Sequence, residues 1–206
     1  MGRPPLTKGH WGILGGTFDP VHYAHLAMAE QTREALGLDG VMFIPAGQPV
    51  HKPMARASAE DRLAMLELAT ADNPAFVVSR LEVDSDREGY SVNTLEQLTA
   101  ERPDDRFVLI MSSEAARALP TWRGPERLLA LCRVAVVPRL GYEMPSREWL
   151  AENFPGQEDR FVLVEASRLG HSATEVRARI ADGRSIRYLV PPAVEAYISQ
   201  HHLYAN

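Results

Sequence analysis

The chain contains a single cysteine, Cys132, among its 206 residues. One cysteine cannot form an intrachain disulfide or an all-cysteine metal site, and such sparse use of cysteine is typical of a reducing compartment, so we expect a cytoplasmic protein. No apolar run approaches the roughly twenty residues that a membrane-spanning helix needs, so no membrane partner is expected. Residues 1–10 also lack an apolar core, and they predict a loose lead-in rather than a secretory signal.

The sequence has no excess of positive charge either. It carries 22 Lys and Arg against 27 Asp and Glu, which gives a formal net charge of −5. Non-specific binding to nucleic acid relies on a basic surface, so nucleic acid is not expected as a partner, whereas a local basic pocket for a small anion is compatible with this charge. The length and the apolar fraction of 45% predict one globular domain, which we place at residues 11–206. The composition leaves the oligomeric state open, a homo-oligomer included.

Short apolar runs alternate with amphipathic segments along most of the chain. Strands are predicted at 12–14, 41–44, 76–78, 107–111, 134–137 and 161–164. Helices are predicted at about 21–36, 58–71, 91–101, 126–131, 172–183 and 191–201, with a short one after the fourth strand, and loops at 45–57 and 142–157. This alternation predicts an α/β fold, a Rossmann-like doubly wound parallel sheet with a small C-terminal helical part. Ligands of such sheets bind beyond the carboxyl ends of the strands.

The segment after the first predicted strand reads Gly15-Gly16-Thr17-Phe18-Asp19-Pro20-Val21-His22-Tyr23-Ala24-His25. Glycine can enter the left-handed region cheaply and lets the backbone approach a bound group closely. Asp19 is expected to cap the next helix, with Pro20 in its first turn. His22 and His25 then lie on one face of that turn. Because a helix N-terminus favours anions, the segment predicts a phosphate site. A lone helical histidine is usually a surface or packing residue, but the combination favours a functional site.

The glycine turn does not have the spacing of a dinucleotide fingerprint or of a P-loop, so the phosphates need other partners. Lys52 is one candidate, with a solvated loop lysine as the ordinary alternative. Ser172 can cap a helix that also carries Thr174 and Arg177, which together suit a triphosphate, although a Ser cap beside a solvent-facing Arg is common. Trp122 can stack on a heteroaromatic ring or serve as a core anchor, and the sequence alone does not decide between these.

Taken together, residues 15–25 and the Ser-x-Thr-x-x-Arg pattern of 172–177 resemble the nucleotidyltransferase superfamily related to class I aminoacyl-tRNA synthetases. Further segments narrow the resemblance to the bacterial nicotinate mononucleotide adenylyltransferases. These segments are 45–52, 62–65, 90–95, 120–122 and 188–191. The resemblance extends from residue 12 to about residue 204.

The resemblance implies an ATP-binding transferase of NAD biosynthesis. Its reaction joins ATP to nicotinate mononucleotide and gives nicotinate adenine dinucleotide and pyrophosphate. The phosphate of the nucleotide attacks the α-phosphorus, so no protein nucleophile is needed, and catalysis consists of positioning and charge stabilisation. The lack of a catalytic carboxylate cluster or of a Ser or Cys constellation agrees with this chemistry. Mg²⁺ is expected on the substrate phosphates, where it keeps several waters, rather than in a dedicated protein metal site.

The resemblance also assigns roles to individual residues. The catalytic residues it implies are His22, His25, Lys52 and Arg177. The ATP-binding residues are Gly15, Gly16, Thr17, Phe18, His22, His25, Glu114, Ser172, Thr174 and Arg177. The nicotinate nucleotide-binding residues are Lys52, Ser91, Val92, Thr94, Trp122 and Arg123. Trp122 would stack on the nicotinate ring, while backbone N–H groups near Ser91, Val92 and Arg123 would take its carboxylate. Backbone donors with no carboxylate nearby favour the acid over the amide.

The sequence departs from the family pattern at two places. Ala24 stands where the family usually has glycine between its two histidines. Residues 112–114 read Ser-Ser-Glu where the family has Gly-x-Asp, so Glu114 would meet the ribose with a longer side chain. Two alternatives therefore stay open. One is a sister adenylyltransferase that acts on the amide nucleotide or, against the evidence of Trp122 and residues 90–95, on phosphopantetheine. The other is a nucleotide-binding sensor that has lost the chemistry.

Overall fold

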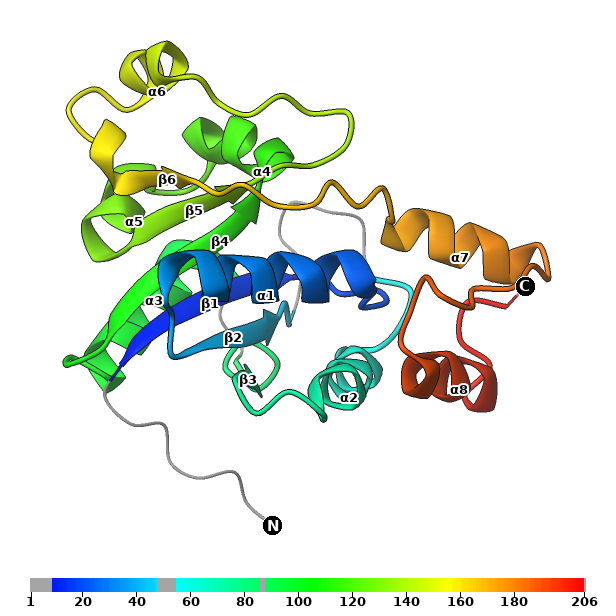
Figure 1. The fold of residues 1–206 in the computed structure, drawn as a ribbon. Helices are drawn as coiled ribbons and strands as arrows, with labels where there is room; N and C mark the ends of the chain where they lie inside the picture. The colour runs from blue at the N-terminus through cyan, green and yellow to red at the C-terminus, as the bar shows by residue number, and fades with distance from the viewer. Residues whose placement is uncertain (1–8, 48–54, 86–87, 206) are drawn as a thin grey trace.

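A parallel β-sheet forms the centre of the molecule, with the strand order β3-β2-β1-β4-β5-β6 (Figure 1). The computed structural model describes residues 9–47, 55–85 and 88–205. Within them the strands are β1 (His10–Gly16), β2 (Gly40–Pro45), β3 (Phe76–Val78), β4 (Arg106–Ser112), β5 (Arg133–Val137) and β6 (Phe161–Leu163). All six predicted strands are therefore confirmed. His10, which the sequence assigned to a loose lead-in, is the first residue of β1, and the N–H of Gly9 donates to the Asp105 carboxylate at 2.8 Å.

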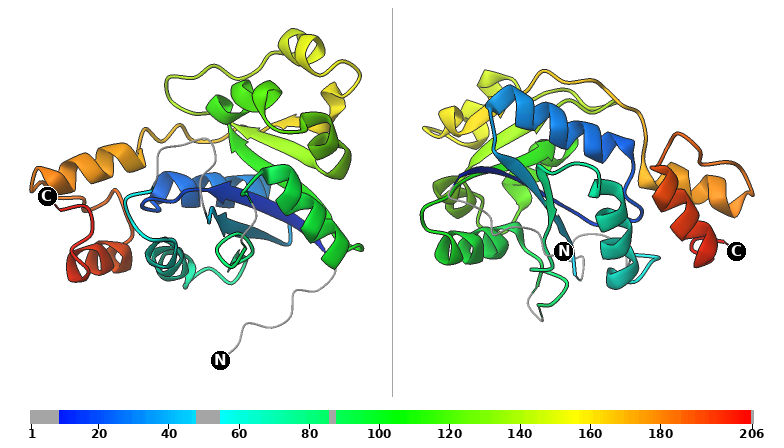
Figure 2. Two further views of the ribbon diagram at one scale, coloured as in Figure 1. Left: turned by 180° about the vertical axis from the view of Figure 1, so that it is seen from behind. Right: turned by 60° about the horizontal axis from the view of Figure 1, so that its bottom comes forward.

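The described chain has eight α-helices. They are α1 (Tyr23–Leu36), α2 (Ala59–Thr70), α3 (Ser91–Glu101), α4 (Ser113–Ala118), α5 (Pro125–Leu131), α6 (Arg147–Asn153), α7 (Ala173–Ala181) and α8 (Pro192–Gln200). Two short 3₁₀ turns, η1 (Leu119–Thr121) and η2 (Glu158–Arg160), join them. Helices lie on both faces of the sheet, with α1 and α3 on opposite sides, whereas α7 and α8 lie beyond one end of it (Figure 2). The prediction of a loop at 142–157 is wrong in part, because α6 lies within it. This helix is too short to show a clear apolar period, and its start is fixed by Ser146, whose hydroxyl accepts from Trp149 N–H.

Alternating side chains of the strands divide the core into two halves. Val41 and Phe43 of β2 pack on the side of α1, α2, α7 and α8, whereas Met42 and Ile44 pack on the side of α3, α4, α5 and α6. A strand buried on both faces reads as a continuous apolar run, which is why the central strands could be recognised in the sequence. The arrangement confirms the predicted Rossmann-like doubly wound sheet, and α7 and α8 form the predicted C-terminal helical part.

The sheet splits between β1 and β4, and this split positions the site. The pairing of β1 with β4 ends at Ile13 opposite Leu109, but β1 continues to pair with β2 as far as Gly16. On the other side, β4 continues along β5 as far as Ser112. The chain order also reverses here, so this is the topological switch point at which parallel α/β sheets bind ligands. The segments that follow β1 and β4 therefore face one crevice.

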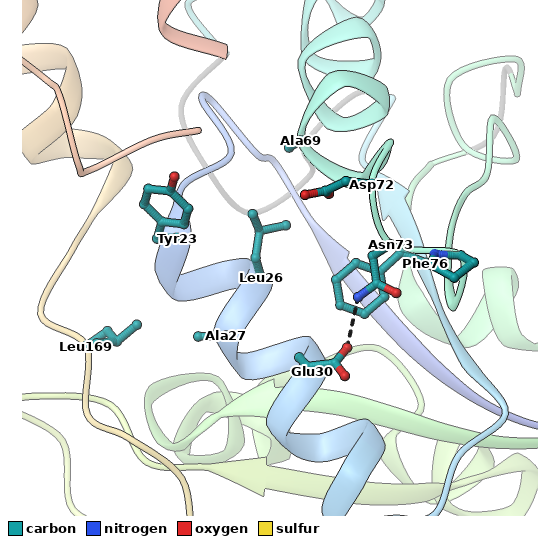
Figure 3. A pocket seen from close by; sticks show the side chains of 10 residues that line it. Tyr23, Leu26, Ala27, Glu30, Ala69, Asp72, Asn73, Phe76 and Leu169 are labelled. Atoms are coloured by element: carbon teal, nitrogen blue, oxygen red, sulfur yellow. Dashed lines mark hydrogen bonds between the residues drawn. The ribbon is translucent and has the colours of Figure 1, made fainter. Parts of the chain in front are cut away.

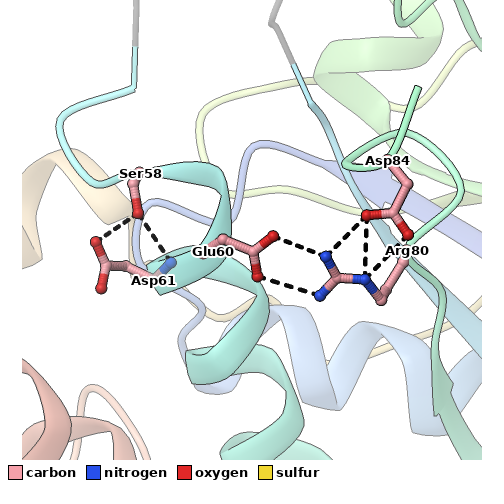
Figure 4. A network of polar contacts seen from close by, with 5 residues as sticks. All are labelled: Ser58, Glu60, Asp61, Arg80 and Asp84. Carbon is pink, nitrogen blue, oxygen red and sulfur yellow. Dashed lines mark hydrogen bonds and ion pairs between the residues drawn. The ribbon is translucent and has the colours of Figure 1, made fainter. Parts of the chain in front are cut away.

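A polar network joins the start of α2 to the segment after β3 (Figure 4). Ser58 caps α2, since its hydroxyl accepts from Asp61 N–H at 3.0 Å, as the sequence predicts. Arg80 pairs with Glu60 at 2.7 Å and with Asp84 at 2.8 Å. These ions are exposed, so solvent screens their attraction and the pairs add little to the stability of the fold. The network fixes the direction of the chain rather than adding much stability.

Candidate active site

The glycines of the turn after β1 differ in backbone conformation from the prediction. Neither Gly15 nor Gly16 has a positive φ, so the expected left-handed glycine is absent, and Phe18 is the left-handed residue instead, with φ 51°. A Cβ added at Gly15 would meet nothing within 4 Å, whereas one at Gly16 would lie 3.2 Å from the Phe18 ring. The backbone at Gly15 thus borders open space at the split of the sheet. Close approach of a ligand, rather than backbone conformation, is the property that glycine supplies there.

Asp19 does not cap the helix that follows it, so this prediction is wrong. The N-cap of α1 is His22, and Pro20, in a cis peptide with Asp19, precedes the helix instead of forming its first turn. Asp19 uses its carboxylate elsewhere. It accepts from the backbone N–H of Arg56 at 2.8 Å and of Ala57 at 3.1 Å, and from the hydroxyl of Tyr204 at 2.8 Å. Its role is to hold three segments together at the turn.

The two histidines lie together, as the sequence predicts. Their rings stack with centroids 3.7 Å apart and planes 20° apart, and the Phe18 ring contacts His25 edge-on at 4.9 Å. His25 Nδ1 accepts the backbone N–H of His22 at 3.3 Å. Phe18 is itself buried in the core, so it supports His25 and does not offer a surface to ATP.

His22 is a buried imidazole with an unsatisfied nitrogen. Its side chain is 5% exposed, and its Nδ1 has no hydrogen-bond partner among the described residues. Burial, followed by the charges of His171 and Arg139, lowers the pKa of His22 to about 3. The ring is therefore neutral at pH 7. A buried polar atom without a partner costs about 1–3 kcal/mol, so this nitrogen has a hydrogen bond to gain from a ligand.

The start of α7 reaches the same turn through Arg177. One of its terminal nitrogens donates to the Asp19 carbonyl at 2.6 Å, and the other donates to the Thr174 hydroxyl at 3.3 Å. Ser172 caps α7, since its hydroxyl accepts from Glu175 N–H at 3.1 Å. The structure thus brings the predicted Ser-x-Thr-x-x-Arg residues to the glycine turn. It also excludes the alternative of a solvent-facing arginine, because Arg177 is anchored across 158 positions of sequence.

Arg62 belongs to this assembly; it was named from the sequence only within the segment 62–65 and was assigned no role. Its side chain is only 1% exposed and donates to the Thr17 carbonyl at 2.8 Å and to the Gly47 carbonyl at 3.1 Å. It therefore joins the turns after β1 and β2. The available signal was an arginine among the buried positions of a predicted helix, since a buried arginine needs fixed partners.

Glu114 lies in the first turn of α4 and is held by an ion pair. Arg139 contacts its carboxylate at 2.6 Å, and a hydrogen bond from Tyr142 to Glu114 accompanies a raised pKa of the Tyr142 phenol. Arg139 is also one of the charges that lower the pKa of His22. The sequence singled out Glu114 but not Arg139, because the pairing joins segments 25 residues apart.

A second group of predicted residues surrounds a small pocket at the start of α3. The pocket has a volume of about 60 Å³ and is lined by Gly89, Tyr90, Ser91, Val92, Trp122 and Arg123. The N-cap residue, Tyr90, does not cap the helix with its side chain, so the first N–H groups of α3 are available at the pocket. The Val92 side chain is buried in the core, and only its backbone can serve a ligand. Trp122 is half-buried: it packs against the core and also lines the pocket, so its role as a core anchor is confirmed and its stacking on a ring stays a prediction.

Two expectations about this pocket change. The Thr94 hydroxyl donates to Glu82 at 2.6 Å, and burial raises the pKa of that carboxyl, so Thr94 supports the turn without lining the pocket. The expectation that no carboxylate lies near the backbone donors is wrong. Glu88 pairs with Arg123 at 3.2 Å, while the Arg123 guanidinium lies 4.8 Å from the centre of the Tyr90 ring.

The remaining observations concern residues outside the phosphate turn and the pocket at the start of α3. Lys52 falls outside the described residues. A hollow of about 540 Å³ between α1 and the end of α2 includes Tyr23, Leu26, Glu30 and Asn73, but none of the predicted site residues (Figure 3). In the described part of the chain, no cluster of three or more His, Cys, Asp or Glu side chains could hold a metal ion. Among the same residues, no helix is long and apolar enough to span a membrane.

The comparisons with known proteins agree with this geometry. A family model described as cytidylyltransferase-like matches residues 13–179, which places the chain in that class of nucleotidyltransferases. A Roseiflexus protein named "Probable nicotinate-nucleotide adenylyltransferase" is 48% identical over 196 residues, covering 94% of this chain and 96% of its own. A Synechococcus (strain JA-3-3Ab) protein of the same name is 44% identical and covers all of both chains.

The chain belongs to the nicotinate-nucleotide adenylyltransferase family. In structure it is similar to the Plasmodium falciparum nicotinic acid mononucleotide adenylyltransferase solved in complex with NaAD, with a TM-score of 0.80. That match covers 96% of this chain and 98% of the other at 18% identity, so it supports the fold alone.

Proposed function

We propose that this chain transfers the adenylyl group of ATP to nicotinate mononucleotide, which gives nicotinate adenine dinucleotide and pyrophosphate in NAD biosynthesis. The observation that carries the proposal is the stacked pair of His22 and His25 at the split of the sheet, in which the buried His22 is neutral. Arg177 is anchored to the same turn and adds positive charge beside it. A neutral imidazole donor beside a guanidinium suits a polyphosphate held for in-line attack.

The reaction forms a bond from the nucleotide phosphate oxygen to the α-phosphorus of ATP and breaks the bond from that phosphorus to the bridging oxygen of pyrophosphate. Since Nδ1 of His25 accepts a backbone N–H, a neutral His25 carries its proton on Nε2, which can donate to a phosphate oxygen. His22 is stacked on His25 and would add a second imidazole beside the same phosphates. Both contacts would strengthen as negative charge moves to the leaving oxygens, which is how a positioned donor lowers a barrier.

The other predicted ATP contacts follow from the same pose. Gly15 and Gly16 would let the backbone approach the phosphates, with Thr17 held in place by Arg62. Arg177, Lys52 and the start of α7 at Ser172 and Thr174 would receive pyrophosphate. Glu114 would exchange its contact with Arg139 for the ribose hydroxyls, which would free Arg139 beside the histidines.

The nicotinate nucleotide would occupy the pocket at the start of α3. Trp122 would stack on the pyridine ring, and the N–H groups of Ser91 and Val92 with that of Arg123 would take the carboxylate. The positive end of the α3 dipole favours this anion. The nearby Glu88 supports a second candidate, a preference for the amide nucleotide, because a carboxylate can accept from an amide N–H₂.

Mg²⁺ would enter with the substrate phosphates. The site residues fit an ion that the substrate phosphates hold, because these residues present hydrogen-bond donors to the phosphates. The oxygens of Asp19 are already engaged by Arg56, Ala57 and Tyr204. The ion would neutralise part of the phosphate charge when bound.

Pyrophosphate release, measured with ATP, Mg²⁺ and either the acid or the amide nucleotide, tests the proposal. We expect turnover with both at unequal rates and a clear preference for the acid. A preference for the amide would establish the second candidate, and no release with either nucleotide would contradict the function. His22→Ala should lower kcat by about 10²–10³-fold, the usual cost of removing a donor to the developing charge. His202→Ala, at an exposed histidine outside the site, is the matched control.

A further inference from the structure

A buried junction behind the phosphate turn joins four segments that are distant in the sequence. Its centre is the Asp19 carboxylate, which accepts from the backbone of Arg56 and Ala57 and from the hydroxyl of Tyr204. Arg177 of α7 approaches the same carboxylate at 3.8 Å while donating to the Asp19 carbonyl. Asp19 thus receives contacts from its own turn, from the entry to α2, from α7 and from the segment after α8.

Tyr204 is the least expected member of this junction. It is 8% exposed, and its backbone lies in the left-handed region with φ 65°, which is unfavourable for an aromatic residue. Such a conformation persists only where surrounding contacts hold it, and strained residues concentrate at functional sites. Burial and the Asp19 carboxylate raise the pKa of the Tyr204 phenol, so it remains a donor. A hydrogen bond to an ionised acceptor is among the stronger ones in a protein.

We infer that Tyr204 is a positioning residue for adenylyl transfer and acts through Asp19. The inference rests on the proposed function of the site. Asp19 precedes His22 by three residues, and its carbonyl is the anchor of Arg177. The Tyr204 hydroxyl fixes the Asp19 carboxylate against the entry to α2, and with it the places of both phosphate-binding groups. Displacement of a binding group by about 1 Å can cost a factor near 10² in rate, so a rigid junction behind the site affects turnover.

The chain offers a matched control in Tyr197 of α8. Its hydroxyl also donates to a carboxylate, that of Asp61 in the first turn of α2, at 3.0 Å. Asp61 is engaged with Ser58 and belongs to neither predicted substrate pocket. The two tyrosines therefore make similar bonds from neighbouring parts of the chain, but only one of them reaches the phosphate turn.

The experiment compares Tyr204→Phe and Tyr197→Phe in the full chain by pyrophosphate release at 25 °C, with melting temperatures measured in parallel. We expect both to lower the melting temperature. Tyr204→Phe should also lower kcat about tenfold, with the KM for the nicotinate nucleotide within about twofold of wild type, because that pocket lies elsewhere. Tyr197→Phe should keep the wild-type kcat.

A wild-type kcat in Tyr204→Phe, or equal losses in both variants, would overturn the inference while the wild-type assay still supports the proposed function. No turnover of the wild type would instead reject the proposed function. If Tyr204→Phe fails to fold, Asp19→Asn tests the same contact from its other side: a lowered kcat supports the inference and a wild-type kcat overturns it. If both single variants fold, their double variant should lose little more than either alone, since both remove one coupled contact.

Discussion

His22 combines burial, a depressed pKa and an unsatisfied nitrogen at the N-cap of α1. Each property alone has a structural explanation, because buried histidines are common in protein cores. Together they describe a buried side chain with an unbonded nitrogen, a combination that is typical of functional sites. This side chain makes the folded protein less stable, and the size of the effect depends on pH.

The pH dependence has a definite sign. In the unfolded chain His22 binds a proton below its ordinary pKa of 6.5, whereas in the folded protein it binds one only near pH 3. Between these values the unfolded state holds more protons, so His22 makes the protein less stable as the pH falls and has no such effect above pH 6.5. The loss amounts to about 2 kcal/mol at pH 5. We predict that His22→Asn removes this part of the pH dependence, as measured by urea unfolding at pH 7 and pH 5.

His202→Asn serves as the control for this measurement, because His202 is exposed. Its unfolding free energy should change between pH 7 and pH 5 as that of the wild type does. The interpretation of His22 fails if His22→Asn retains the full wild-type pH dependence.

At the scale of single elements, the start of α3 shows how stability and binding can conflict. The Tyr90 side chain leaves the first N–H groups of α3 without a cap, and those groups border the pocket that includes Trp122. A capping side chain would stabilise the helix but occupy the donors proposed for the nicotinate carboxylate. An acidic cap would also repel that carboxylate.

We predict that Tyr90→Asp raises the KM for the nicotinate nucleotide about tenfold relative to Tyr90→Asn, with little change in the KM for ATP. The two variants have nearly the same shape and differ in charge, so the comparison isolates repulsion at the helix N-terminus. Steady-state kinetics with each substrate varied in turn provides the measurement. Equal KM values for the nicotinate nucleotide in the two variants would argue against the carboxylate position.

The elements also show what local sequence can and cannot predict. The β4 strand was recognised because five consecutive apolar residues have few alternatives, and the end of α1 because Gly37 adopts the left-handed conformation of a helix stop. The start of α1 was placed too early because Asp19 and Pro20 are good capping residues in isolation. In the folded chain the Asp19 carboxylate instead accepts hydrogen bonds from Ala57 and Tyr204, which are distant in the sequence. Local helix propensity carries no information about such distant partners.

At the scale of the whole molecule, we expect the metal ion of the proposed reaction to bind with the substrate phosphates and not as a structural part of the fold. No metal-binding cluster occurs among the residues that the structure describes, and the polar groups at the phosphate turn are donors or are already engaged. We predict that EDTA abolishes pyrophosphate release while the melting temperature of the unliganded protein stays unchanged. A structural ion would link metal to stability, so a lower melting temperature in EDTA would contradict this prediction.

Much of the site was accessible from the sequence because its motifs are short. His22, His25 and Arg177 were identified from local spacing, and the structure places them around one turn. Arg62 was noted only within the segment 62–65, and Tyr204 was given no role, because their partners are backbone carbonyls and a carboxylate at distant positions. Contacts of that kind depend on the path of the whole chain, which residue type and spacing do not specify.

The bond between Asp19 and Tyr204 spans 185 positions of the sequence. The residues that line the pocket around Trp122 all lie within 89–123, whereas the phosphate turn cannot gain its last contact until Tyr204 has been added. Contacts of such long range form late because they close the largest loops. A nascent chain would therefore complete the pocket around Trp122 before it completes the contacts of the phosphate turn. The proposed transfer activity would appear only at the final step of folding.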